Sequence, residues 1–259
     1  MKRRIGIILL AVLVFGAITF FTLAPGVVEN SANKVAPTEL KVSAHAEALH
    51  KTLDVADMHA DSLLWKRDLL KRSDRGQVDL PRLQAGHYAL QVFSSVTKAP
   101  RNQNYDGNSG DTDKVTALVI ADMQPVRTWN SLLERSLYHA EKLKRFAARS
   151  DGQMRVVTTA ADLDKLVADR RAGRPVVGAM LSIEGLQDLE GRLDNLDRLY
   201  AAGFRMAGLA HFFDNDVSGS MHGIAKGGLT PLGRQVVARM EKLGMLVDVS
   251  HASKAAMLA

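Results

Sequence analysis

The stretch GLTPLGRQVVARMEKLGMLVDVSHAS, residues 228–253, contains one complete structural unit and ends close to a histidine. Thr230 is a favourable N-cap and Pro231 a favourable first helical residue, so a helix is expected from there to Gly244. The apolar run that begins at Met245 predicts a strand that closes on His251. A helix leading directly into an apolar strand is typical of a parallel sheet.

The same unit recurs upstream. A helix over residues 159–173, opened by a capping box of Thr159 and Asp162, precedes the strand PVVGAMLSIEG (175–185). A helix over 192–202, ended by Gly203, precedes the strand FRMAGLAHF (204–212). Further segments predict two strands at 54–61 and 88–96, a long polar loop at 97–111, a helical region at 112–149 split at Pro125, and a short peripheral strand at 154–159. This alternation indicates an α/β fold.

Polar side chains fall where these strands end: His59 and Asp61, then Glu184, His211 and His251. His59 and Asp61 alone are also compatible with a hydrogen-bonded pair in the core. Four endings that carry only His, Asp and Glu favour a metal site, because the carboxyl ends of barrel strands gather on one face. The chain has no cysteine, so the ligands must be nitrogen and oxygen, which suits zinc or manganese.

The N-terminus predicts a membrane segment. MKRR is followed by an apolar run without charge from Ile5 to Val28, long enough to span a bilayer. Positive charge before the run keeps the N-terminus in the cytoplasm. An uncleaved anchor is favoured over a cleaved signal peptide, for which TLAPG offers a candidate cleavage site. The expected organisation is therefore an anchor or signal at 1–28, a linker at 29–47 and one domain at 48–259.

The charge balance argues against a nucleic-acid partner. The net charge is +6, but Lys2, Arg3 and Arg4 all precede the apolar run. The remaining basic residues, such as Lys142 and Lys144, mix with acids at helical spacing and predict a solvated helix face.

From about residue 53 to its end, the sequence resembles the membrane dipeptidase family of metallopeptidases. The resemblance rests on DMHADSLLW (57–65), SIEG (182–185), GFRMAGLAH (203–211) and the stretch 228–253. It implies a distorted (β/α)8 barrel, a TIM barrel of the metal-dependent hydrolase type, and hydrolysis of small dipeptides by a zinc-bound hydroxide.

The resemblance also implies a role for each strand-end residue. His59 and Asp61 correspond to ligands of a first zinc ion, Glu184 to the carboxylate that bridges two zinc ions, and His251 to a ligand of the second. His211 corresponds to the histidine that contacts the substrate and stabilises the tetrahedral intermediate. The loop after His211, FFDNDVSGSMHG, is less similar to the family and is expected to line the substrate pocket.

The chain ends at Ala259, whereas family members continue with a strand that carries a further metal-binding histidine, then a substrate-binding arginine and an aspartate that handles protons. We therefore expect an incomplete barrel that lacks its C-terminal strands, a truncated form of the enzyme, and doubtful activity of this chain alone.

Two alternatives stay open on the sequence. One is another amidohydrolase-type hydrolase, acting on a lactone or an N-acyl amino acid. The other is a non-catalytic fragment tethered to the membrane. In the favoured interpretation the partners are a small dipeptide and the membrane, a homodimer is one compatible assembly, and the catalytic domain lies on the periplasmic or extracellular side or is exported after signal cleavage.

Overall fold

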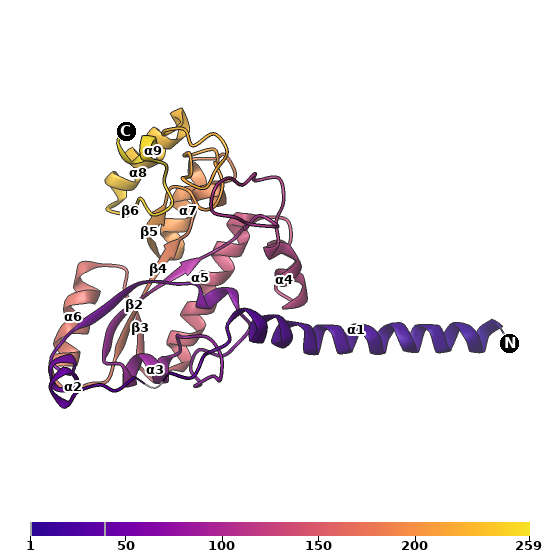
Figure 1. Ribbon diagram of the computed structural model, residues 1–259, viewed down its shortest axis with the longest axis horizontal. Coiled ribbons are helices and arrows are strands. Elements are labelled where there is room, and N and C mark those ends of the chain that lie inside the picture. Colours follow the sequence, from indigo (N-terminus) through magenta and orange to yellow (C-terminus); the bar gives the residue numbers. More distant parts are fainter. Residues whose placement is uncertain (1, 39) are drawn as a thin grey trace.

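Six parallel strands form one sheet in the computed structural model, which describes residues 2–38 and 40–259 (Figure 1). The strand order is β1-β2-β4-β5-β6. Strands β3 and β5 lie on the same side of β4: β3 pairs with the first half of β4, and β5 pairs with the second half. The strands are β1 (Val55–Ala60), β2 (Tyr88–Ser95), β3 (Met154–Val156), β4 (Val177–Ile183), β5 (Phe204–Gly208) and β6 (Leu246–Asp248). The predicted parallel α/β sheet is confirmed.

The middle of the sheet is its most buried part. In β4, Val177, Leu181 and Ile183 are fully buried, and the register with β2 runs from Leu90 opposite Gly178 to Ser95 opposite Ile183. A strand buried on both faces needs a continuous apolar sequence, which VVGAMLSI supplies. This register brings the carboxyl ends of β2 and β4 to the same level.

Helices connect the strands and cover the sheet. The first helix is α1 (Lys2–Ala32). It is followed by α2 (Ala44–His50), α3 (Leu80–Ala85), α4 (Val115–Ala121), α5 (Leu132–Arg149), α6 (Ala160–Arg171), α7 (Asp194–Ala202), α8 (Pro231–Leu243) and α9 (Lys254–Met257), with 3₁₀ turns η1 (Ser62–Leu64), η2 (Val126–Thr128) and η3 (Leu186–Leu189). Pro125 caps η2 between α4 and α5, so the predicted split of the helical region is confirmed.

The helix ends follow local chemistry. The capping box of Thr159 and Asp162 opens α6, and the Thr230 side chain accepts a hydrogen bond from the Gly233 N–H at the start of α8. Gly203 and Gly244 end α7 and α8 with left-handed backbones, which glycine adopts without a Cβ penalty. These C-terminal helix ends determine where β5 and β6 begin.

The sheet is open. β1 and β6 lie at the two ends of the strand order and are each paired on one side only, and apolar side chains such as Met58 and Leu246 stay exposed on them. The fold is a partial (β/α) barrel, as predicted, because a closed barrel would pair these edges.

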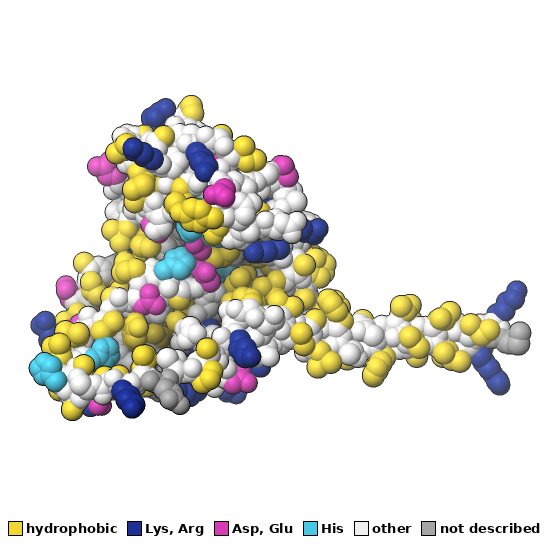
Figure 2. Space-filling model, viewed as in Figure 1, with side chains coloured by type: hydrophobic (Ala, Val, Ile, Leu, Met, Phe, Trp, Pro, Cys, Tyr) yellow, Lys and Arg dark blue, Asp and Glu magenta, His cyan; other side chains and the backbone are white. Residues whose placement is uncertain are grey.

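The long helix α1 (Lys2–Ala32) extends away from the domain (Figure 1). It is long and apolar enough to cross a membrane, and its apolar side chains are exposed along its length (Figure 2). The helix continues to Ala32, so the first residues of the segment expected to be a linker belong to it.

Candidate metal centre

Four separate strands bring the predicted site residues together. His59 lies in β1 and Asp61 directly after it, while Glu184, His211 and His251 follow β4, β5 and β6. Because these strands are parallel and belong to one sheet, in which only β2 separates β1 from β4, their carboxyl ends meet at one edge of the sheet. The geometric basis of the sequence prediction is therefore confirmed.

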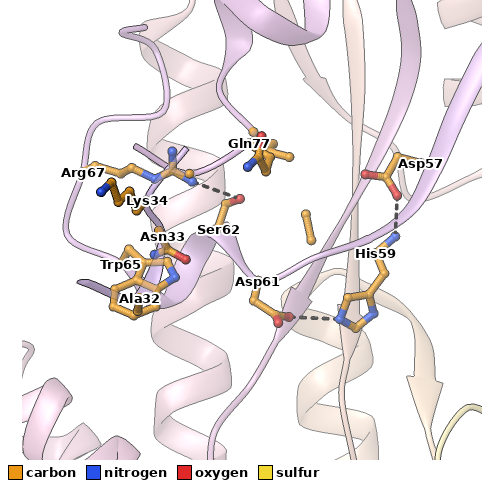
Figure 3. A pocket seen from close by; sticks show the side chains of 13 residues that line it. Ala32, Asn33, Lys34, Asp57, His59, Asp61, Ser62, Trp65, Arg67 and Gln77 are labelled. Atoms are coloured by element: carbon orange, nitrogen blue, oxygen red, sulfur yellow. Dashed lines mark hydrogen bonds and ion pairs between the residues drawn. The ribbon is translucent and has the colours of Figure 1, made fainter. Parts of the chain in front are cut away.

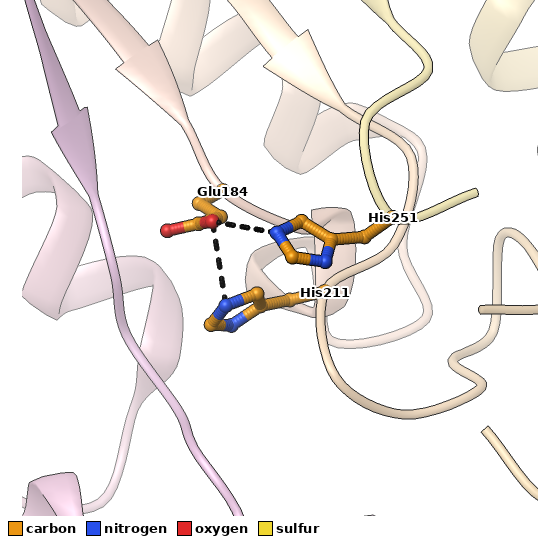
Figure 4. Close-up of side chains that lie close together, drawn as sticks. All are labelled: Glu184, His211 and His251. Atoms are coloured by element: carbon orange, nitrogen blue, oxygen red, sulfur yellow. Dashed lines mark ion pairs between the residues drawn. The ribbon is translucent and has the colours of Figure 1, made fainter. Parts of the chain in front are cut away.

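Glu184 is the centre of this cluster (Figure 4). Its Oε1 lies 3.3 Å from His211 Nε2 and 3.2 Å from His251 Nε2. Ligands of a tetrahedral zinc ion with bonds of ~2.1 Å lie about 3.4 Å apart. The spacing of the three side chains therefore fits a small divalent cation held among them.

A second group shares the same carboxylate. His59 Nε2 lies 3.3 Å from Glu184 Oε2 and 3.0 Å from Asp61 Oδ1, and Figure 3 shows the His59–Asp61 pair. Ligand atoms of His59, Asp61 and Glu184 all lie within 4.8 Å of one another, as do those of Glu184, His211 and His251. One carboxylate that belongs to two such groups can hold two cations at short separation.

Local backbone geometry sets these positions. Gly185 has φ +86°, and a Cβ there would lie 2.9 Å from the backbone nitrogen of His211. Only glycine lets the chain turn after Glu184 while His211 approaches so closely. His251 itself has φ +62°, a costly conformation for histidine, and the Met221 N–H donates to its carbonyl oxygen at 2.8 Å.

Burial and mutual contacts shift the pKa values of the cluster. Burial alone would raise the pKa of Glu184, but hydrogen bonds from His251 and His59 outweigh it and hold that pKa far below its usual range. Hydrogen bonds to Asp61 and Glu184 raise the pKa of His59 to about 10, and burial lowers the pKa of His211. A carboxylate that stays ionised among imidazoles is prepared to bind a cation.

A buried polar network supports the Glu184 end of β4. The Glu184 N–H donates to the Ser95 carbonyl oxygen at 3.1 Å, and Ser95 Oγ lies 2.8 Å from Ser136 Oγ and from His139 Nδ1. Ser136 in turn hydrogen-bonds to Asp188, whose pKa is raised by burial to about 8. The network ties the end of β4 to α5.

Sequence reasoning missed an aromatic group beside the cluster. Phe212 stacks on His222 with ring centroids 4.6 Å apart, and the His222 ring lies 5.2 Å from that of His251. Tyr105, from the predicted polar loop, packs edge-on against His222, and its carbonyl oxygen lies 2.8 Å from His222 Nδ1. His222 sits in a glycine-rich loop rather than at a strand end, so strand-end placement could not identify it.

One detail of the strand prediction differs. Asp61 lies beyond β1 and is the N-cap residue that precedes η1, so alternation along a strand does not place it beside His59. The turn into η1 brings the two side chains together instead. All five residues still converge, while their individual roles stay predictions.

Comparison with known proteins gives a consistent assignment. The family model described as membrane dipeptidase (peptidase family M19) matches residues 43–259. An uncharacterized dipeptidase of Schizosaccharomyces pombe is 30% identical over 181 residues, which cover 68% of this chain and 39% of that protein. Dipeptidase aclJ of Aspergillus oryzae is 27% identical over 214 residues, covering 78% and 45%.

Solved structures share the fold. The probable dipeptidase PvdM from Pseudomonas aeruginosa superposes with a TM-score of 0.63 at 22% identity, covering 83% of this chain and 50% of that one. A Rhodobacter sphaeroides metallopeptidase, solved with a phosphinate mimic of the dipeptide L-Ala-D-Ala, gives 0.56 at 20% identity, covering 79% and 60%. The chain spans less than half the length of the two curated relatives above.

Proposed function

Because the chain belongs to the membrane dipeptidase family, peptidase family M19, we propose that it is part of a metal-dependent hydrolase that cleaves the peptide bond of small dipeptides. The observation that carries this proposal is the convergence of three imidazoles on the single carboxylate of Glu184, within 3.2–3.3 Å. A solved relative bound to a dipeptide mimic supports the substrate class.

The metal is proposed to be zinc, with two ions in the complete enzyme. His59 and Asp61 would hold the first and His251 the second, with Glu184 shared between them. Nitrogen and oxygen donors, and the absence of cysteine from the sequence, support zinc or a similar ion. Bound there, the cations would polarise the peptide carbonyl and make water a nucleophile near neutral pH.

His211 is proposed to act on the substrate rather than on the metal. Its buried imidazole has a lowered pKa and is therefore neutral at pH 7, carrying one N–H. With the proton on Nε2, which faces Glu184, His211 can donate a hydrogen bond to an oxyanion that develops beside the carboxylate. Its Nε2 also lies within ligand distance of the Glu184–His251 pair, so the two roles need an experiment to separate them.

Paired variants distinguish these roles. We expect His251→Asn to lower the zinc content of the purified protein, whereas His211→Asn keeps the zinc content and lowers dipeptide hydrolysis by about 100-fold or more. Zinc is measured by mass spectrometry and hydrolysis by release of free amino acids from a dipeptide panel. Loss of zinc from His211→Asn would make His211 a ligand instead.

The same panel tests the substrate class. Free amino acids released from dipeptides, with no opening of lactones or N-acyl amino acids, are the expected outcome. The reverse preference would place the protein among other amidohydrolase-type enzymes. Less than one bound zinc ion per chain would support the non-catalytic, membrane-tethered fragment.

We also propose that α1 is an uncleaved anchor, with the domain on the periplasmic or extracellular side. The apolar run after Lys2, Arg3 and Arg4 supports this orientation. Membrane fractions should contain the chain with its N-terminus intact, and external protease should digest the domain in spheroplasts. The homodimer stays a prediction, for which light scattering is the test.

A further inference from the structure

The transmembrane helix is fixed to the domain rather than linked to it by a flexible segment. Glu29 of α1 is only 5% exposed and pairs with Arg67 at 3.1 Å. Arg75 Nη1 donates to the Gly26 carbonyl oxygen at 2.9 Å, and the Gly76 N–H donates to the Asn33 carbonyl oxygen at 2.7 Å. These contacts set the direction of α1 relative to the sheet.

The domain also flanks the helix further toward its N-terminus. A groove beside α1 is lined by Lys66 and Met123 of the domain and, on the helix, by Val14, Ala17, Ile18, Phe21 and Thr22. Lys66 lies just after η1, and Met123 just after α4, whose residues contact α1. The domain therefore overlaps with the apolar part of the helix.

This overlap leaves too little free helix to cross a bilayer. From Ile5 to Ile18 the helix has about 14 residues, or roughly 21 Å at ~1.5 Å per residue. The hydrocarbon core of a bilayer is about 30 Å thick and needs about 20 residues. A helix that enters near Ile5 therefore leaves the hydrocarbon near residue 24, beyond the level of Met123.

The part of the domain beside the groove has side chains that suit contact with lipid. Met123 is 65% exposed and Val126 is 72% exposed, although both are apolar. Lys66, which lines the same groove as Met123, is also exposed, and its ammonium group can pair with lipid phosphate. Figure 2 shows hydrophobic side chains continuing from α1 onto the adjoining part of the domain.

We propose that Lys66, Met123 and Val126 form a membrane-contact corner that is buried at the boundary between the headgroups and the acyl chains of the bilayer spanned by α1. The occupant is lipid, because the corner is continuous with the membrane helix and lies at the depth that the helix length demands. The domain then rests on the membrane in one orientation, with α4 and η2 against the lipid.

The absence of cysteine from the sequence makes a labelling test direct. Met123→Cys and Val126→Cys, each labelled with the fluorophore NBD, are reconstituted as full chains in vesicles of phosphatidylethanolamine and phosphatidylglycerol. The vesicles carry a doxyl spin label on the acyl chain near the headgroup. Ile18→Cys reports insertion of the helix, and Leu258→Cys, 78% exposed near the C-terminus, is the matched aqueous control.

We expect the labels at positions 123 and 126 to show blue-shifted emission and at least about half of the quenching seen at position 18, with none at position 258. Quenching at 18 with none at 123 and 126 would overturn the corner, because the domain would then stand clear of the bilayer. Absence of quenching at 18, or recovery of a chain that lacks α1, would overturn the proposal as well.

Discussion

The affinity of the His59–Asp61–Glu184 group for zinc should rise steeply with pH. In the metal-free protein, hydrogen bonds to Asp61 and Glu184 raise the pKa of His59 to about 10, so its ring is protonated at neutral pH. Zinc binds only the neutral ring, and binding must therefore displace this proton. Glu184 and His211, with lowered pKa values, are already in the forms that can coordinate a cation.

The magnitude follows from this proton count. Below the His59 pKa, each pH unit should strengthen the apparent zinc affinity about tenfold, so the change between about pH 7 and pH 9 should be about 100-fold. Affinity is measured by competition with a fluorescent chelator of known pH dependence. Calorimetry in buffers of different ionisation enthalpy should find about one proton released per ion at pH ~8.

Two neighbouring aspartates provide the controls. Asp61→Asn removes the largest cause of the raised pKa of His59, so the dependence on pH above 7 should shrink even as total affinity falls. Asp57 accepts a hydrogen bond from the backbone N–H of His59, not from its ring, so Asp57→Asn should keep the full dependence. A wild-type affinity that changes less than about threefold between pH 7 and 9 would refute the reasoning.

Three further variants test the fold beneath the site. Gly185→Ala places a Cβ 2.2 Å from Gln187 Oε1 at φ +86°, so the rate of dipeptide hydrolysis should fall at least about tenfold. Gly228→Ala is the control, because a Cβ there meets its neighbours at ordinary contact distance, and it should keep wild-type activity. Equal loss of activity in both variants would contradict the argument. Leu181→Ala empties a fully buried position in β4 and should cost about 2–5 kcal/mol of unfolding free energy in urea denaturation, while the exposed Leu258→Ala should change it by less than about 0.5 kcal/mol. Burial raises the pKa of Asp188 to about 8, so this carboxyl group keeps its proton in the folded state while the unfolded chain loses it, and the wild type should lose stability as pH rises from about 4 to 8. Asp188→Asn should weaken this pH dependence. Identical dependence of the unfolding free energy on pH in the wild type and the variant, measured by urea denaturation, would argue against a protonated Asp188.

The sequence predicted the order of elements because its signals are local. Thr230, Pro231 and Gly244 delimit α8 through hydrogen bonds and backbone preferences within a few residues. The same holds for the capping box of Thr159 and for the break at Pro125. Strand-end placement of the site residues was also predictable, since parallel strands in this fold class align their carboxyl ends.

Contacts between distant segments were not predictable in this way. No periodic signal marks Glu29 as a buried partner of Arg67, because the pair joins the long apolar helix α1 to a loop after η1. The polar loop that carries Tyr105 gave no indication that it would lie over His222. Both contacts depend on tertiary packing, which hydrophobic periodicity does not encode.

The shared carboxylate of Glu184 also determines when the protein can acquire its metal. Its partners follow β5 and β6 on one side and belong to the β1 end on the other, so neither of the two described groups exists until β4 has paired with its neighbouring strands. A polypeptide threaded through a membrane in extended form therefore cannot carry ions with it. Loading must draw on the metal supply of the compartment in which the sheet assembles, and metal uptake there in turn favours the assembled state.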